Sequence, residues 1–197
     1  ARPRLAWAGP VKVYIVGGRG KKSVICLDER RLQNLGAGGQ QPAGGGALWD
    51  AAAVPDMPST RQAGGAAWLG GKLFVAGGDV DDEFCSSSLL CFDPATRAWE
   101  TKASMITGRE FFALEPLDGK LYACGGEGDD EERVNSVERY DPSTDAWEEV
   151  APMSTARSDF ASSVLNGQLY VVGGYSDGVG LRSVERYTPS SNTWEAV

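Results

Sequence analysis

The sequence contains no histidine among its 197 residues. Histidine is the commonest general base and the commonest metal ligand, so its absence excludes Ser–His–Asp catalysis and histidine-bound metal centres. Cysteine is scarce as well: the four residues Cys26, Cys85, Cys91 and Cys124 form no CxxC pair and show no zinc-ligand spacing. We therefore expect no metal, no cofactor and no disulfide framework, and we expect a reduced, cytoplasmic setting.

Long apolar runs and an excess of positive charge are also lacking. No window of about twenty apolar residues occurs, so no segment is expected to span a membrane. The net charge is -8 and the pI is near 4.6, which argues against nucleic acid as a partner. This composition favours a protein partner with a basic surface.

Glycine is abundant, with 26 residues, and much of it lies in an internal repeat. Glycine pairs end four apolar runs, and a tryptophan follows each pair. The pairs are Gly17–Gly18, Gly77–Gly78, Gly125–Gly126 and Gly173–Gly174, and the tryptophans are Trp49, Trp99, Trp147 and Trp194. The last three units repeat every 47 to 48 residues, a period typical of propeller blades. The predicted units are about 11–61, 62–109, 110–157 and 158–197.

Each unit is predicted to contain four short antiparallel strands. In the fourth unit these are FASSVL, QLYVV, VERY and TWEAV, with a tight turn at Asn166–Gly167 between the first two. Asp118–Gly119 and Gly70–Gly71 occupy the same place in the third and second units. Such dipeptides favour the hairpin turns in which both central residues have positive φ. The apolar runs are too short for helices, so the chain is predicted to be all-β.

These units resemble the kelch repeats of the kelch-like family. The resemblance is carried by KLYACGG and SVERYDPSTDAWEEVAPMSTAR in the third unit and by QLYVVGG and SVERYTPSSNTWEAV in the fourth. The first unit matches at VYIVGG and LWDAAAVPDMPSTR but departs between them, where a Gly/Ala/Gln-rich loop spans about 35–47. The resemblance implies a kelch-type β-propeller with four four-stranded blades.

Kelch-like proteins typically carry BTB and BACK domains ahead of a propeller that is usually six-bladed. By resemblance, the BTB–BACK region contacts a cullin, and the propeller captures the protein to be ubiquitinated. This chain contains four propeller units and no BTB–BACK region. We expect an incomplete arc of a six-bladed ring, because unpaired strand edges promote aggregation. A closed four-bladed ring is the alternative.

The loops after the glycine pairs differ most between units, so they are the candidates for partner specificity. They leave the same end of each blade and are expected to share one face. The acidic candidates lie in the second and third loops, and the other two candidates lie in the first and fourth. The candidates are Asp79, Asp81, Asp82, Glu127, Asp129, Asp130, Glu131, Arg19 and Tyr175. An acidic patch would attract a basic segment, whereas the alternative is a merely solvated surface.

Three arginines recur in the links between units, at Arg61, Arg109 and Arg157. Kelch-like propellers often use arginines at this position to grip acidic peptides, so the resemblance makes them partner-binding candidates. Strict repetition fits equally well with a structural role, in which each guanidinium bonds loop carbonyls.

The preferred functional interpretation is a substrate-recognition propeller of a cullin-dependent ubiquitin ligase adaptor. An actin- or cytoskeleton-binding kelch scaffold is the alternative. An enzyme is not expected: the chain lacks the histidines of kelch copper oxidases and the SxDxGxTW boxes of sialidase-like propellers. A hydrolase with a carboxylate pair is a weaker possibility, since no spacing singles out such a pair.

Overall fold

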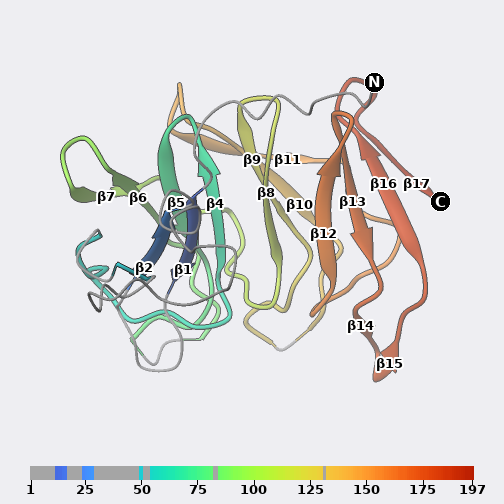
Figure 1. The fold of residues 1–197 in the computed structure, drawn as a ribbon. Coiled ribbons are helices and arrows are strands. Elements are labelled where there is room, and N and C mark those ends of the chain that lie inside the picture. The colour runs from blue at the N-terminus through green and yellow to red at the C-terminus, as the bar shows by residue number, and fades with distance from the viewer. Residues whose placement is uncertain (1–11, 17–23, 29–48, 51–53, 82–83, 131) are drawn as a thin grey trace, which may run out of the picture.

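The computed structural model describes residues 12–16, 24–28, 49–50, 54–81, 84–130 and 132–197. In these ranges the protein contains β-strands and no helix. The strands form antiparallel sheets that follow one another along the chain, one for each predicted unit (Figure 1).

We number the sheets as blades 1 to 4. Blade 1 has three described strands, which correspond to the second, third and fourth strands of the other blades. They are β1 (Lys12–Val16), β2 (Val24–Asp28) and β3 (Trp49–Asp50). Blade 2 consists of β4 (Gly65–Leu69), β5 (Lys72–Ala76), β6 (Leu89–Asp93) and β7 (Ala98–Lys102).

Blades 3 and 4 repeat the four-stranded order. Blade 3 consists of β8 (Ala113–Leu117), β9 (Lys120–Cys124), β10 (Val137–Asp141) and β11 (Ala146–Val150). Blade 4 consists of β12 (Ala161–Leu165), β13 (Gln168–Val172), β16 (Val184–Thr188) and β17 (Thr193–Ala196). A small hairpin, β14 (Tyr175–Ser176) and β15 (Val179–Gly180), projects from one end of blade 4 (Figure 1).

The three predicted hairpin turns are confirmed. Both central residues have positive φ at Gly70–Gly71, Asp118–Gly119 and Asn166–Gly167. Each turn therefore fixes the register of the first two strands of its blade, for example Leu165 opposite Gln168.

The hydrophobic core lies in the seams between blades. Because side chains alternate along a strand, each blade sends one apolar set to the preceding blade and one to the next. One cluster joins Phe74 and Leu89 of blade 2 to Leu121 and Tyr140 of blade 3, and a second cluster joins blades 3 and 4. The recurring methionines Met57, Met105 and Met153 are all buried, Met105 and Met153 in these two clusters and Met57 in a third.

The recurring tryptophans close the seams from the outer strand. Trp147 stacks at 5.2 Å on Tyr140 of its own blade, and its indole N–H donates to the carbonyl of Ala103 in the link from blade 2. Trp194 repeats this arrangement with Tyr187 and Ala151. Each tryptophan is half-buried and joins its blade to the preceding one.

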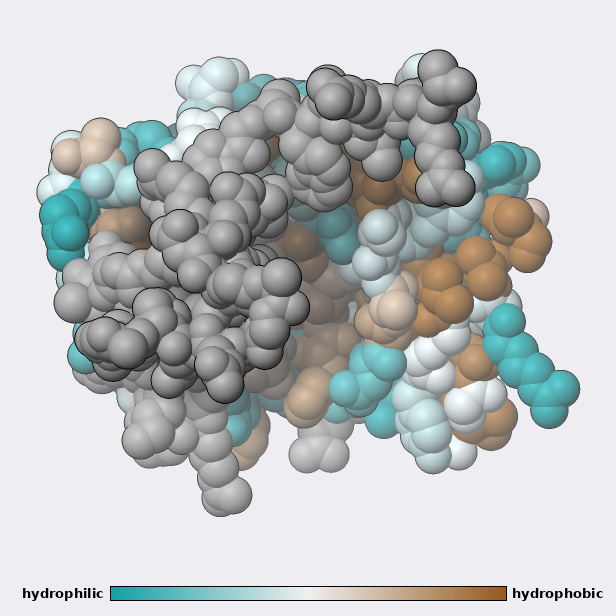
Figure 2. All heavy atoms as spheres, in the orientation of Figure 1, coloured by the Kyte–Doolittle hydropathy of each residue, from teal (hydrophilic) through white to brown (hydrophobic). Residues whose placement is uncertain are grey.

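In the described part of the chain, the outer face of blade 4 is exposed. Leu165 and Val172 are 58% and 46% exposed there, whereas the equivalent Leu117 and Cys124 of blade 3 are 4% and 0% exposed against blade 4. Figure 2 shows apolar side chains gathered on the side of the molecule where blade 4 lies. The arrangement is that of an incomplete propeller.

Candidate binding face

Links and loops meet at one end of the blades, which we call the loop face. There the link that enters each blade pairs with the loop that follows its glycine pair. Isolated antiparallel β-bridges pair Gln62 with Asp79, Glu110 with Glu127, and Ser158 with Tyr175. The three described loops therefore lie on one face, fixed to the scaffold at their first residue.

The glycine pairs allow this close approach. Gly78 has a φ of 78°, and a Cβ there would lie 2.1 Å from the carbonyl oxygen of Gln62. Its N–H donates to the carbonyl of Arg109, in the link to the next blade. A larger residue would be strained by its backbone and would also push the link away.

The recurring arginines are buried beneath this face. Arg109 is 0% exposed and donates to the carbonyls of Gly125 and Ser136 and to Oε1 of Glu138, the last at 2.7 Å. The carboxylate of Glu138 also accepts hydrogen bonds from the backbone N–H groups of Ile106 and Thr107. The whole group ties the link between blades 2 and 3 to the interior of blade 3.

Arg157 repeats this network in blade 4. It is 0% exposed and donates to Gly173 O and to Glu185 Oε1 at 2.8 and 2.5 Å. Burial alone would raise the pKa of Glu185, but hydrogen bonds from Ser154 and Arg157 outweigh it and lower that pKa.

Arg61 differs because Leu90 stands where Glu138 and Glu185 stand in the next blades. Arg61 donates to the carbonyl of Gly77 and to Oγ of Ser88. Burial lowers its pKa to about 10, and the charge of Asp81 opposes this shift. Asp81 also accepts from the N–H and hydroxyl of Thr60, so it serves the scaffold.

This burial favours the structural alternative for Arg61, Arg109 and Arg157 over their role as partner-binding candidates. They are 3%, 0% and 0% exposed, and all three are occupied by groups of the protein itself. A buried charge is retained only when it is hydrogen-bonded or paired, which is the structural alternative that strict repetition had left open.

Two acidic candidates also hold loops in place through hydrogen bonds and an ion pair. Asp79 accepts from the side-chain amide of Gln62 at 2.6 Å. Glu127 accepts from the Ser158 hydroxyl at 2.8 Å and pairs with Arg133 at 3.1 Å. Both carboxylates are partly buried and hold loops to links.

Three acidic side chains of the third loop remain exposed on this face: Asp129, Asp130 and Glu132. Asp159 and Asp177 of blade 4 are exposed as well. The candidates Arg19, Asp82 and Glu131 lie outside the described residues. The third loop therefore holds the largest group of exposed acidic side chains described on the loop face.

Tyr175 begins the projecting β14–β15 hairpin and is 42% exposed. Its hydroxyl donates to the carbonyl of Gly178, and the guanidinium of Arg133 lies 5.6 Å from its ring centroid. Arg133 thus braces the third loop through Glu127 and joins it to the fourth loop through Tyr175. Tyr175 presents an aromatic surface beside the acidic loop.

The sequence analysis missed a set of residues two positions after each recurring arginine. Ala63, Phe111 and Asp159 all have positive φ, between 51° and 55°. Phe111 donates its N–H to Ala63 O, and Asp159 donates to Phe111 O, so the three run from blade to blade. Phe111 is 41% exposed. Ala63, Phe111 and Asp159 occupy the same position in successive units but differ in residue type, and this variation in the sequence could have identified them.

The chemistry of this face suits binding. In the described ranges no three His, Cys, Asp or Glu side chains converge as a metal site. Among the same residues, no helix has the length and apolarity to cross a bilayer. The exposed carboxylates beside Tyr175 and Phe111 would complement a segment that carries both basic and apolar side chains.

Comparisons with known proteins identify the family. The model of the KLHDC2/KLHL20/DRC7 Kelch-repeats domain matches residues 5–197. No curated protein matches the chain. Among solved structures, the one titled "Structure of YjhT" is similar in fold, with a TM-score of 0.66 and 18% identity. The match covers 74% of this chain and 52% of that one, so the chain spans about half the length of this solved relative.

The family match extends over nearly the whole chain, and the blades carry the glycine pairs, arginines and tryptophans that define the repeat. The kelch resemblance and the all-β propeller expected from the sequence are therefore confirmed. The chain belongs to the kelch-repeat β-propellers.

Proposed function

We propose that the chain captures a protein partner on its loop face, as the substrate-recognition propeller of a cullin-dependent ubiquitin ligase adaptor in the cytoplasm. A kelch-repeat domain is typically a protein-binding module. Contact with the cullin would be made by a BTB–BACK region, which these 197 residues do not include. The partner would present a basic segment to the exposed carboxylates.

One observation carries the proposal. The residues that repeat in every blade are used to build the scaffold, while exposed charged and aromatic side chains occupy the variable positions of one face. Asp129, Asp130 and Tyr175 stand at such positions. Charge complementarity of this kind speeds encounter and selects among partners.

Charge reversal at the third loop tests the binding face. Replacing Asp129, Asp130, Glu131 and Glu132 with lysine in the full-length protein should weaken the recovery of bound protein by about tenfold or more at low salt. The melting temperature should remain nearly unchanged, because the described members of this set are exposed. Glu149→Lys on β11 is the matched control, since it removes an exposed acid away from the loops.

Co-purification followed by mass spectrometry tests separately the acidic binding face and the role in a cullin-dependent ligase. We expect a cullin to be recovered with both variants, and the substrate only with the control. Recovery of the same bound proteins with the loop variant would contradict the acidic binding face. Sedimentation with filamentous actin and no recovery of a cullin would favour the cytoskeletal alternative over the ligase role.

A further inference from the structure

A groove of about 320 Å³ lies at the seam between blades 2 and 3. Its apolar floor is formed by Leu69, Phe74 and Cys91 of blade 2 and Tyr140 of blade 3. It includes Gly70 and Gly119 of the hairpin turns, which lie at the opposite end of β5 and β9 from the loop face. The groove is therefore distinct from the surface assigned to the protein partner.

The repeat explains why the groove exists. Cys91 faces Glu100 across the β6–β7 ladder, as Arg139 faces Glu148 and Arg186 faces Glu195 in the next blades. In blade 2 the short thiol thus stands where the other two blades have a long guanidinium side chain. The space that an arginine would fill is left open.

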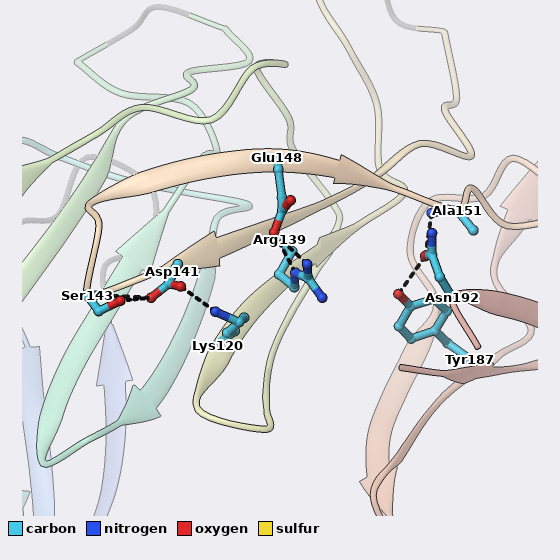
Figure 3. A network of polar contacts seen from close by, with 8 residues as sticks. All are labelled: Lys120, Arg139, Asp141, Ser143, Glu148, Ala151, Tyr187 and Asn192. Carbon is cyan, nitrogen blue, oxygen red and sulfur yellow. Dashed lines mark hydrogen bonds and ion pairs between the residues drawn. The ribbon is translucent and has the colours of Figure 1, made fainter. Parts of the chain in front are cut away.

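The neighbouring seam shows the filled arrangement. Arg139 donates to Oε1 of Glu148 from both Nε and Nη2, at 2.9 and 2.5 Å. Figure 3 shows this side chain between the Lys120–Asp141 pair and Tyr187 of blade 4. Tyr122 of blade 3 is likewise replaced by Phe74 in blade 2, which removes a hydroxyl from the groove.

The charge of the groove comes from two lysines. Lys72 pairs with Asp93 at 2.9 Å, a pair that blade 3 repeats with Lys120 and Asp141. Lys102 is particular to blade 2, because Val150 and Val197 occupy its position in blades 3 and 4.

Lys102 pairs with Glu100 at 2.8 Å, and its side chain is 27% exposed. Both lysines line the groove, while their carboxylate partners lie outside the lining. The groove thus presents two ammonium groups to a ligand, each of which already has a carboxylate partner.

We propose that this seam groove binds a small aromatic carboxylate. The ring would lie against the partly exposed Leu69, above the nearly buried Phe74, Cys91 and Tyr140. The carboxylate would compete with Glu100 for the ammonium of Lys102. The volume falls within the range of small-molecule sites, roughly 300–1,000 Å³, and such sites combine an apolar lining with a few charged groups. An ammonium–carboxylate contact at the edge of an apolar site fixes the orientation of the ligand.

Isothermal titration calorimetry and saturation-transfer NMR on the full-length protein test this site, with 2-naphthoate as the probe. We expect saturable binding with a dissociation constant on the order of 1 mM, as ligands of this size allow. The neutral analogue 2-naphthol should bind about five- to tenfold more weakly. Equal affinities for the two probes, or no saturation, would overturn the proposal.

Variants that restore the repeat provide the decisive controls. Cys91→Arg should fill the groove and abolish binding of 2-naphthoate, and retained binding in a folded variant would place the probe elsewhere. Lys102→Val introduces the residue of blades 3 and 4, so folding should be preserved. It should reduce the affinity for 2-naphthoate to that for 2-naphthol, and an unchanged preference for the acid would contradict the role of Lys102.

The converse change in blade 3 should create a site. Arg139→Cys combined with Val150→Lys gives that blade the groove residues of blade 2, and we expect a second naphthoate-binding site in the calorimetric stoichiometry. An unchanged stoichiometry would contradict the explanation drawn from the repeat. The loop-face variant described above should bind 2-naphthoate normally, so the two proposals fail independently.

Discussion

Buried arginines determine much of the chemistry of this protein at the scale of single residues. Arg109 and Arg157 have no exposed surface, yet each reaches carbonyls, a serine and a glutamate of the blade that follows it. Removing one member of such a pair leaves an uncompensated buried charge, which is far more costly than losing an exposed pair.

Glu185→Gln is expected to show this cost. It should lower the free energy of unfolding at pH 7 by about 3–5 kcal/mol, the usual range for breaking a buried pair. Glu195→Gln is the control, because it removes a half-exposed partner of Arg186 and should change stability little. Urea unfolding of both variants measures the difference, and similar losses would contradict the structural role of Glu185.

The same carboxylate predicts a pH dependence. The pKa of Glu185 is lower in the folded protein than in the unfolded chain, so its contribution is complete above the unfolded value, about 4.3. It is lost as the pH falls through the lower, folded value. The stability of the wild type should therefore decline more steeply than that of Glu185→Gln between about pH 5 and pH 2. Parallel declines would contradict the lowered pKa.

Two cysteines, Cys85 and Cys124, are expected to be unreactive in the folded protein. Cys85, Cys91 and Cys124 are buried, and burial is the largest cause that raises the pKa of Cys85 to about 11 and that of Cys124 to about 12. The acidic residues near Cys85 make a smaller contribution to the rise in its pKa.

Alkylation by iodoacetamide at pH 8 tests this in a variant that combines Cys26→Ser with Cys91→Ser, since Cys91 lines the seam groove. We expect labelling of the folded protein to be about 100-fold slower than that of the urea-unfolded chain, since the thiolate is the reactive form. The rate should rise with pH toward 11, because the neutral thiol predominates below the raised pKa. Equal rates for the folded and unfolded chains would show that these seams open readily.

At the scale of elements, two kinds of glycine serve different purposes. Gly119 in the β8–β9 turn has a φ of 74°, and a Cβ there would meet nothing within 4 Å. Gly126, the second glycine of the β9 pair, has a φ of 98°, and a Cβ would lie 2.5 Å from Glu110 O. Position 119 requires glycine only because of its positive φ. Position 126 requires glycine also because a side chain would collide with the neighbouring link.

Alanine substitutions at these two glycines should differ accordingly. Gly119→Ala should cost about 1–2 kcal/mol, the strain of a left-handed backbone. Gly126→Ala should cost clearly more, because the link at Glu110 must move as well. Thermal unfolding compares them. A larger effect at Gly119 would contradict the idea that the glycine pairs hold the links close.

At the scale of the whole molecule, the outer face of blade 4 carries exposed apolar side chains in the described part of the chain. Leu165, Val172 and Val184 repeat the positions at which blade 3 packs on blade 4. A face of this composition is covered by another blade in a closed propeller.

Leu165→Asp combined with Val172→Asp tests this covering in the full-length protein. If a further blade packs there, burying two carboxylates should destabilise the protein by about 3 kcal/mol or more. Ser190→Asp, in the exposed turn between β16 and β17, is the control. Unchanged stability of the double variant would show that the face remains in contact with water.

The sequence by itself determined the elements of this protein. Alternating apolar residues, the Asn166–Gly167 type of turn and the period of 47 to 48 residues depend on local backbone preferences, which can be read along the chain. The four units and their strands follow from these features, while the kelch family follows from the resemblance of the repeat motifs and from the family match.

Only the tertiary structure decided what the recurring and variable side chains do. Arg157 is part of the scaffold because Glu185, 28 residues later, closes a buried network around it. Cys91 leaves a groove because blade 3 packs beside the position at which blades 3 and 4 have an arginine, and the short thiol does not fill that space. Burial and charge pairing depend on segments that are distant in sequence. The repeat pattern therefore identified these positions but could not tell whether their side chains lie on the surface or in the interior.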